Sequence, residues 1–285
     1  MLDHETTALL ESGSFVAAMT KARQTVGTVQ LLLSAATLLL VFTPPVRAQQ
    51  AMTMTFSFAE PVVQVNGPAY LEVKMQNTGS EKLRVSFGYH GKWNYDFFVV
   101  EPDGTKVAVP PYRQYGPGPS GNVSIDPQGT ETRRLLLNEW YVFRKPGEYT
   151  VNVKVAALLR TSTSTSWQSE FSDKLTLQVA PRDPARLKEI CENLAAAAVA
   201  TSPPDSNTAT ESAFALSYIP DPVAVPYLAR VLREGNSAGR EHAIRGLARV
   251  GSPDAIEVLK ANRHNADPEI RSQVEAALAQ IRSGT

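Results

Sequence analysis

The sequence reads LSYIPDPVAVPYL at residues 216–228 and LARVGSPDAIEVL at residues 247–259. The two stretches align with Leu216 on Leu247, and the same offset carries Leu247 onto Leu278. A fixed period of this size is typical of a helical solenoid, in which each unit contributes a pair of short helices. The pattern therefore predicts a stack of helices over the last third of the chain.

Helix starts in this part of the chain are marked by a capping side chain that precedes a proline. Asp221-Pro222, Ser252-Pro253 and Asp267-Pro268 all show this order. The capping side chain accepts an otherwise unpaired backbone N–H, and proline at the first helical position has no N–H to lose. Gly251 follows the last apolar residue of its helix, where a left-handed residue is expected. Thr208 with Glu211 predicts a capping box at the start of another helix.

Apolar spacing assigns a core face and a solvent face to these helices. In the helix that ends near Val250, the apolar residues at helical spacing predict one buried stripe, and Glu241, Arg245 and Arg249 are expected on the opposite face. One helix pair cannot cover its own apolar stripe, so residues 183–200 are expected to form a further helix that closes the stack. Cys191, the single cysteine, lies on the stripe of that helix, which indicates a buried structural thiol.

Residues 221–228 and 240–256 resemble the HEAT repeat family in its short bacterial form, called PBS-lyase HEAT-like. The resemblance covers about a quarter of the chain. It implies an α-solenoid that acts as a scaffold for protein–protein interaction, in which the second helix of each pair lines the inner face.

The hydrophobic period changes to two over residues 52–179, as in Leu71, Val73 and Met75. Strict alternation indicates antiparallel strands with one solvated face, and turn signals separate some seven to nine of them, which favours a β-sandwich. Residues 146–151 resemble the start of a late strand in an immunoglobulin-like domain, with Tyr149 either at a tyrosine corner or in the core. Residues 160–170 are expected to form a long hairpin loop. The predicted fold is an immunoglobulin-like antiparallel β-sandwich followed by a short HEAT-like α-solenoid.

Residues 1–48 have the pattern of a targeting segment. Lys21 and Arg23 precede an apolar run at residues 29–42, and residues 46–48 fit a signal peptidase site. The run is short for a membrane span, which needs about 20 apolar residues.

We expect a signal peptide at 1–48, with Met19 as an alternative start, a β-sandwich at 49–180 and helical repeats at 181–285. The alternative is an uncleaved anchor. Cleavage would leave an extracytoplasmic protein, periplasmic or secreted, without a membrane span.

Composition and motifs argue against several functions. Lys and Arg total 28, as do Asp and Glu, and this balance disfavours a nucleic-acid partner. The sequence has no nucleophile elbow, Walker loop or His-Glu-x-x-His motif, and its four histidines are scattered. We therefore expect a non-enzymatic module that binds a protein partner, with no cofactor and no metal.

Two sets of residues are candidates for partner binding. Exposed Tyr, Trp and Arg dominate interface hot spots, and loops at the end of a sandwich are common binding sites. The first set lies in two aromatic segments of the β-rich part: Tyr89, Trp93, Tyr95, Tyr112, Arg113 and Tyr115. The second set lies on the second helices of the repeats: Tyr227, Arg230, Arg233, Lys260 and Arg263.

Other interpretations of both sets remain open. The aromatic residues could cover the end of the sandwich, and the basic residues could form an ordinary solvated face. A hydrolase or carbohydrate-binding protein with a site around Trp93 and Tyr112 is the alternative function. A structural envelope protein that packs on its own copies is the third.

Overall fold

The computed structural model describes residues 51–89, 91–110, 120–200 and 206–283. These residues all belong to one compact unit, 45–285. The expected signal segment at 1–48 lies outside the described residues. Among the helices that are described, none is both long enough and apolar enough to cross a membrane.

The first part of the described chain, here called the β region, consists of strands and one short 3-10 helix, and the alternating sequence explains why. Leu71, Val73 and Met75 are fully buried, and the residues between them face outward. The strands are β1 (Met52–Phe58), β2 (Val62–Gln64), β3 (Tyr70–Asn77), β4 (Leu83–Tyr89), β5 (Tyr95–Val100), β6 (Lys106–Ala108), β7 (Ser120–Ile125), β8 (Thr130–Leu136), β9 (Gly147–Arg160) and β10 (Trp167–Ala180), and the 3-10 helix is η1 (Leu137–Glu139).

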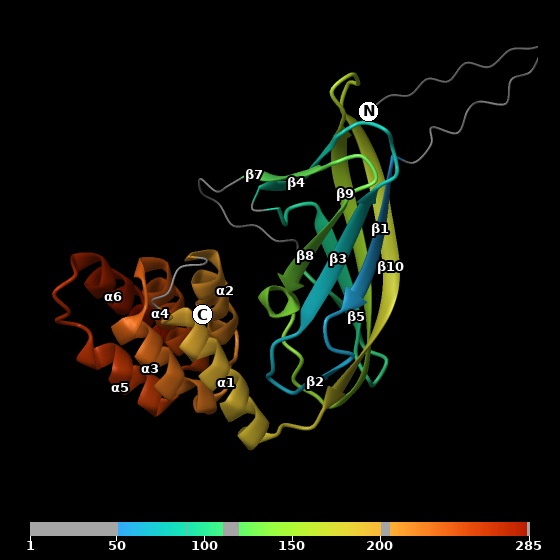
Figure 1. Ribbon diagram of the computed structural model, residues 1–285. Coiled ribbons are helices and arrows are strands. Elements are labelled where there is room, and N and C mark those ends of the chain that lie inside the picture. The colour runs from blue at the N-terminus through green and yellow to red at the C-terminus, as the bar shows by residue number, and fades with distance from the viewer. Residues whose placement is uncertain (1–50, 90, 111–119, 201–205, 284–285) are drawn as a thin grey trace, which may run out of the picture. The chain divides into compact units, whose positions relative to one another are not determined.

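The strands form two sheets that share one apolar core (Figure 1). One sheet has three strands in the order β1-β3-β8. The other has seven strands, with the path β2-β10-β9-β4-β7, and β5 pairs with β9 while β6 pairs with β5. The pairs are antiparallel except that β2 runs parallel to β10, so the expectation of a purely antiparallel sheet was wrong at this edge. The chain passes from β1 in the three-stranded sheet to the short β2 at the edge of the seven-stranded sheet. There β2 lies alongside the last strand, β10.

The hairpin of β9 and β10 is longer than expected, and its loop is shorter. Trp167 pairs with Leu159, so residues 167–170 belong to β10 and not to the loop. The hydroxyl groups of Ser162 and Thr163 donate to the carboxylate of Glu81 at 2.9 and 2.7 Å, and they hold the turn. Polar hydroxyl side chains suggested an irregular loop, but cross-strand pairing extends the ladder through half of that segment.

Tyr149 is fully buried, and its hydroxyl group donates to the carbonyl oxygen of Lys145 at 3.0 Å. The same hydroxyl accepts the backbone N–H of Lys145 at 3.3 Å. A hydrogen bond to the backbone a few residues upstream is the bond that a tyrosine corner makes. Tyr149 is thus a core residue that also fastens the start of β9.

The second part, here called the helical region, has α-helices in two layers (Figure 1). Neighbouring helices α2, α4 and α6 form one layer, and α1, α3 and α5 form the other. Leucine, isoleucine and alanine side chains between the layers make a second apolar core. The helices are α1 (Pro184–Ala198), α2 (Ser206–Ser217), η2 (Pro222–Ala224), α3 (Val225–Glu234), α4 (Ser237–Val250), α5 (Pro253–Ala261) and α6 (Pro268–Ser283).

Most of the predicted helix ends are confirmed. The side chain of Ser252 accepts the N–H of Ala255, and Gly251 has φ 58° in the left-handed region. The capping box at Thr208 was wrong, because α2 begins at Ser206 and Thr208 lies within the helix. The sequence interpretation also missed Asn236, whose side chain caps α4 by accepting the N–H of Gly239 at 2.7 Å.

Cys191 is buried in the helical core, as predicted, with no exposed surface. Burial raises the pKa of its thiol to about 12, because the apolar surroundings disfavour the thiolate. We expect a disulfide reagent such as 5,5′-dithiobis(2-nitrobenzoic acid) to label native Cys191 only as fast as the chain opens. The unfolded chain in guanidinium chloride is the control, and immediate labelling of the native protein would contradict the prediction.

Candidate functional site

The predicted aromatic segments do not form one exposed cluster in the described residues. Trp93 follows β4 and is 39% exposed, whereas Tyr95 begins β5 and is only 1% exposed. The ring of Tyr95 lies 5.6 Å from that of Phe87 and 6.1 Å from that of Phe97. Tyr95 is therefore a core residue, because it shares the inward face of its strand with Phe97. The prediction that Tyr95 binds a partner was wrong.

Three members of the aromatic set, Tyr112, Arg113 and Tyr115, lie outside the described residues. Tyr89 is the last residue of β4. Trp93 is therefore the member of this set that is exposed among the residues with a described surface.

The predicted basic residues of α3 are paired with an acidic neighbour. Arg230 Nε lies 3.0 Å from Glu234 Oε2, and Arg233 Nη2 lies 2.7 Å from Glu234 Oε1. Tyr227 packs partly against the helical core. This helix therefore presents two cations that share one carboxylate.

The predicted basic residues at α5 are also paired. Lys260 Nζ lies 2.8 Å from a carboxylate oxygen of Glu257, and Arg263 Nε lies 3.1 Å from that of Glu275. Exposed pairs of this kind contribute little stability, about 0–1 kcal/mol each. They do, however, offset the charge, so the basic candidates of α3 and α5 do not form an unopposed positive patch.

The other helical layer has a closed seam between α2 and α4. The ring of Phe214 lies 5.1 Å from that of His242 and 5.0 Å from that of Tyr218. The guanidinium group of Arg249 lies 3.8 Å from the centre of the Tyr218 ring and donates to the carbonyl oxygen of Ser217 at 3.0 Å. Arg249 is exposed, as expected for the solvent face of α4, and it also reaches across to Ser217 at the end of α2.

A side chain of the β region, Lys92, contacts this closed seam. Lys92 Nζ lies 4.9 Å from the centre of the Phe214 ring, which is a cation–π contact. Lys92 also forms an ion pair with Glu139, whose side chain is only 1% exposed. Burial raises the pKa of Glu139, and the nearby cation of Lys92 opposes that shift.

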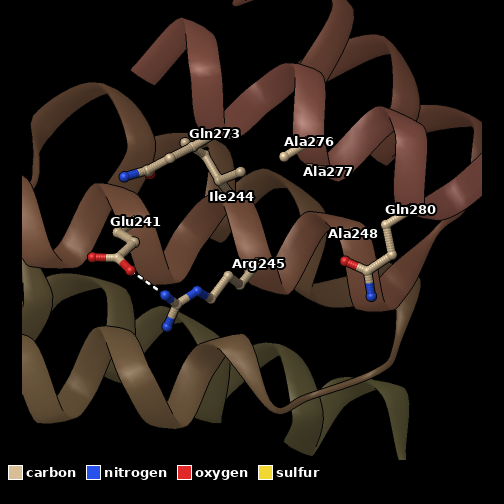
Figure 2. Close-up of a pocket in the computed structure, with 8 residues that line it drawn as sticks. All are labelled: Glu241, Ile244, Arg245, Ala248, Gln273, Ala276, Ala277 and Gln280. Carbon is tan, nitrogen blue, oxygen red and sulfur yellow. Dashed lines mark hydrogen bonds and ion pairs between the residues drawn. The ribbon is translucent and has the colours of Figure 1, made fainter. Parts of the chain in front are cut away.

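The next seam, between α4 and α6, is open (Figure 2). It is a groove of about 270 Å³. Ile244 and Ala277 are 2% and 6% exposed and lie at its base. Figure 2 shows the ion pair of Glu241 with Arg245 on the α4 side and the amide of Gln273 on the α6 side. The groove residues are Glu241, Ile244, Arg245, Ala248, Gln273, Ala276, Ala277 and Gln280.

The repeat alignment that places Leu216 on Leu247 relates the open groove to the closed seam. Phe214 in the closed seam corresponds to Arg245 in the groove, and His242 corresponds to Gln273. The aromatic side chains that fill the first seam are therefore absent from the second. The sequence carried this signal, because the alignment places these residues at equivalent positions, but the binding candidates in the repeats were taken only from the second helices.

Comparison with known families identifies the helical part. Residues 193–279 match the family model described as HEAT repeats. The helical region contains a HEAT-repeat domain. None of the curated proteins compared with the chain matches it. Among the described residues, no group of three or more His, Cys, Asp and Glu side chains is placed to hold a metal ion.

Solved structures show partial likeness to the chain. Human deoxyhypusine hydroxylase in complex with glycerol is 20% identical over 36% of this chain and 44% of its own, with a TM-score of 0.29. This chain therefore spans less than half of that protein. PapD-like domain 7 of human CEP192 is 9% identical over 47% of this chain and 87% of its own, with a TM-score of 0.29. Spo0M of Bacillus subtilis is 14% identical over 50% and 56%, with a TM-score of 0.27. Similarity at this level defines neither the fold of the whole chain nor its function.

Proposed function

We propose that this protein is an exported, non-enzymatic interaction module, in which an immunoglobulin-like β-sandwich carries a HEAT-repeat domain that binds a protein partner. The match to HEAT repeats supports the helical part of this proposal. Two sheets around one core, together with the hydrogen bonds of Tyr149, support the sandwich. The signal-like residues 1–48 support export.

The observation that carries the proposal is the open groove between α4 and α6. Equivalent positions one repeat earlier are filled by aromatic side chains and covered by Lys92. The same helical layer thus already contacts a side chain of the β region at its first seam, and among the described residues its second seam stays open as the groove. A protein segment is therefore the kind of occupant that the second seam fits best.

The dimensions of the groove also favour a peptide over a small molecule. Its volume of about 270 Å³ is smaller than the roughly 300–1,000 Å³ of typical small-molecule pockets. The small side chains of the alanines that line it leave room for one apolar side chain of a partner, and the amides of Gln273 and Gln280 can pair with the backbone of that partner.

We expect Ala276→Trp to block the groove and to lower partner capture at least about tenfold, equivalent to about 1.4 kcal/mol. Ala276 lines the groove and is exposed, so a larger side chain fills the groove without entering the core. Ala279→Trp on the same helix is the matched control, because Ala279 is exposed and does not line the groove.

The measurement uses a photoreactive residue at Gln280 of the chain and an envelope extract of the source organism. A protein cross-linked in the original chain and in Ala279→Trp, but lost in Ala276→Trp, would support the proposal. Equal cross-linking in all three chains would contradict it. Denaturant unfolding of the two variants checks that both remain folded, since exposed substitutions usually change stability by about 0.5 kcal/mol or less.

A further inference from the structure

The mouth of the α4–α6 groove holds a guanidinium group that is available to a ligand. The side chain of Arg245 is 48% exposed, and that of its partner Glu241 is 36% exposed. A solvated ion pair on one helix contributes little stability, so a second carboxylate can join or replace Glu241. Arginine carries five N–H donors in a planar fork, which suits a carboxylate held by two parallel hydrogen bonds.

The charged groups that line the groove are Arg245 and Glu241, both on α4. Next to the groove, burial first and then Arg245 lower the pKa of His242 to about 4. A carboxylate of a partner segment that enters the groove would meet the guanidinium group of Arg245.

The α6 wall presents amide groups that a peptide backbone can satisfy. Gln273 Nε2 donates to Glu269 at 3.3 Å, but its Oε1 atom is buried and accepts no hydrogen bond from the described residues. A buried acceptor without a donor is unfavourable. The amide of Gln273 would gain a donor by turning toward a backbone N–H of a bound segment.

The repeat alignment gives an internal comparison for the sign of the ligand charge. In the closed seam, the aromatic ring of Phe214 receives the cation of Lys92 at 4.9 Å. The corresponding position in the open groove, one repeat later, is Arg245. An aromatic ring attracts a cation, whereas an arginine attracts an anion. The second seam therefore suits a negatively charged group, where the first seam takes the positive charge of Lys92.

We propose that the groove between α4 and α6 binds an acidic peptide segment of a protein partner. An Asp or Glu carboxylate of the segment binds Arg245, an apolar side chain next to it packs on Ile244 and Ala277, and the peptide backbone pairs with Gln273. This assignment rests on the proposed function and adds the chemistry of the partner to it.

Selection of random peptides, displayed on phage against the immobilised chain, tests this assignment. We expect the selected peptides to be richer in Asp and Glu than the starting library. One selected peptide is then synthesised with a fluorescent label. Its affinity should fall about tenfold with Arg245→Gln, because the hydrogen bonds to a charged group are lost, and it should fall with rising salt.

Arg230→Gln is the matched control for that measurement. Arg230 forms the same kind of i,i+4 ion pair, with Glu234, on a helix that does not line the groove. Its variant should bind the peptide as the original chain does. Neutral or basic selected peptides, a failure to select any peptide, or equal binding by Arg245→Gln would each overturn the assignment. The proposed function would survive such a result if Ala276→Trp still abolishes capture of the natural partner.

Discussion

Replacing Asp221 by alanine is expected to lower the free energy of unfolding by about 2–4 kcal/mol. The Asp221 side chain is only 2% exposed and accepts from Arg182 Nε at 2.6 Å and Arg182 Nη2 at 2.9 Å. It also accepts the N–H of Val223 at 3.1 Å and the side-chain amide of Asn66 at 3.2 Å. The loss leaves these donors without their acceptor. Arg182 stays 41% exposed and can be solvated, which keeps the cost below that of a fully buried pair.

The contribution of Asp221 should also depend on pH. Hydrogen bonds from Arg182 lower its pKa from 3.8 to about 2 in the folded chain. A depressed carboxyl pKa stabilises the fold above the unfolded value and loses that effect as the pH falls through the folded value. The stability difference between the original chain and Asp221→Asn should thus be full above about pH 4 and shrink toward pH 2.

Urea unfolding at pH 7, 4 and 2.5 measures that difference, and Asp254→Asn is the control. Asp254 lies exposed in the first turn of α5, and its replacement should change stability by about 0.3–1 kcal/mol through the helix dipole alone. A difference for Asp221→Asn that stays constant over this range would show that the carboxylate charge is not what stabilises the contact.

Asp221 also shows how far local sequence reasoning extends. Its place before Pro222 predicted a helix cap, and the bond to Val223 confirms it. The bond from Asn66, which is 155 residues away, has no signature in any local pattern. A periodicity of two predicts strands and one of 3.6 predicts helices. Neither periodicity predicts which residues of the β region contact which residues of the helical region.

Other parts of the prediction failed although the sequence held the relevant signal. Tyr95 continues the alternation of Phe97 and Val99, and all three are buried in β5. An aromatic residue at a strand start was assigned to the surface because neighbouring residues looked like a loop. On α3, Glu234 follows Arg230 by four residues, and this spacing predicts the ion pair that offsets the expected basic patch.

The repeat itself was the most reliable signal, and it also explains the difference between the two seams. Apolar positions that recur in each repeat keep the helices stacked, so the core residues Leu216, Leu247 and Leu278 are equivalent and buried. Positions outside the core are free to differ between units. Phe214 and Arg245 differ in this way, and the result is one seam closed by aromatic packing and one left open as a groove.

Gly246→Ala is expected to lower the free energy of unfolding by about 2 kcal/mol, although alanine favours a helix by about 1 kcal/mol over glycine. A Cβ atom at Gly246 would lie 2.8 Å from Ser217 Cα and 2.7 Å from Leu228 Cδ2. The first contact is to backbone, so α2 and α4 would have to move apart, and this separation would loosen the closed seam.

Gly239→Ala is the matched control for this substitution, because it lies in the same helix but has more space. Its Cβ atom would meet Asn236 Oδ1 at 3.2 Å and carbon atoms no nearer than 3.6 Å. We expect the gain in helix propensity to leave Gly239→Ala within about 1 kcal/mol of the original chain. Thermal and urea unfolding of both variants measure the contrast. If Gly246→Ala were as stable as Gly239→Ala, the two helices could not approach as closely as described. The repeat stack would then not depend on glycine at the seam that Phe214 closes.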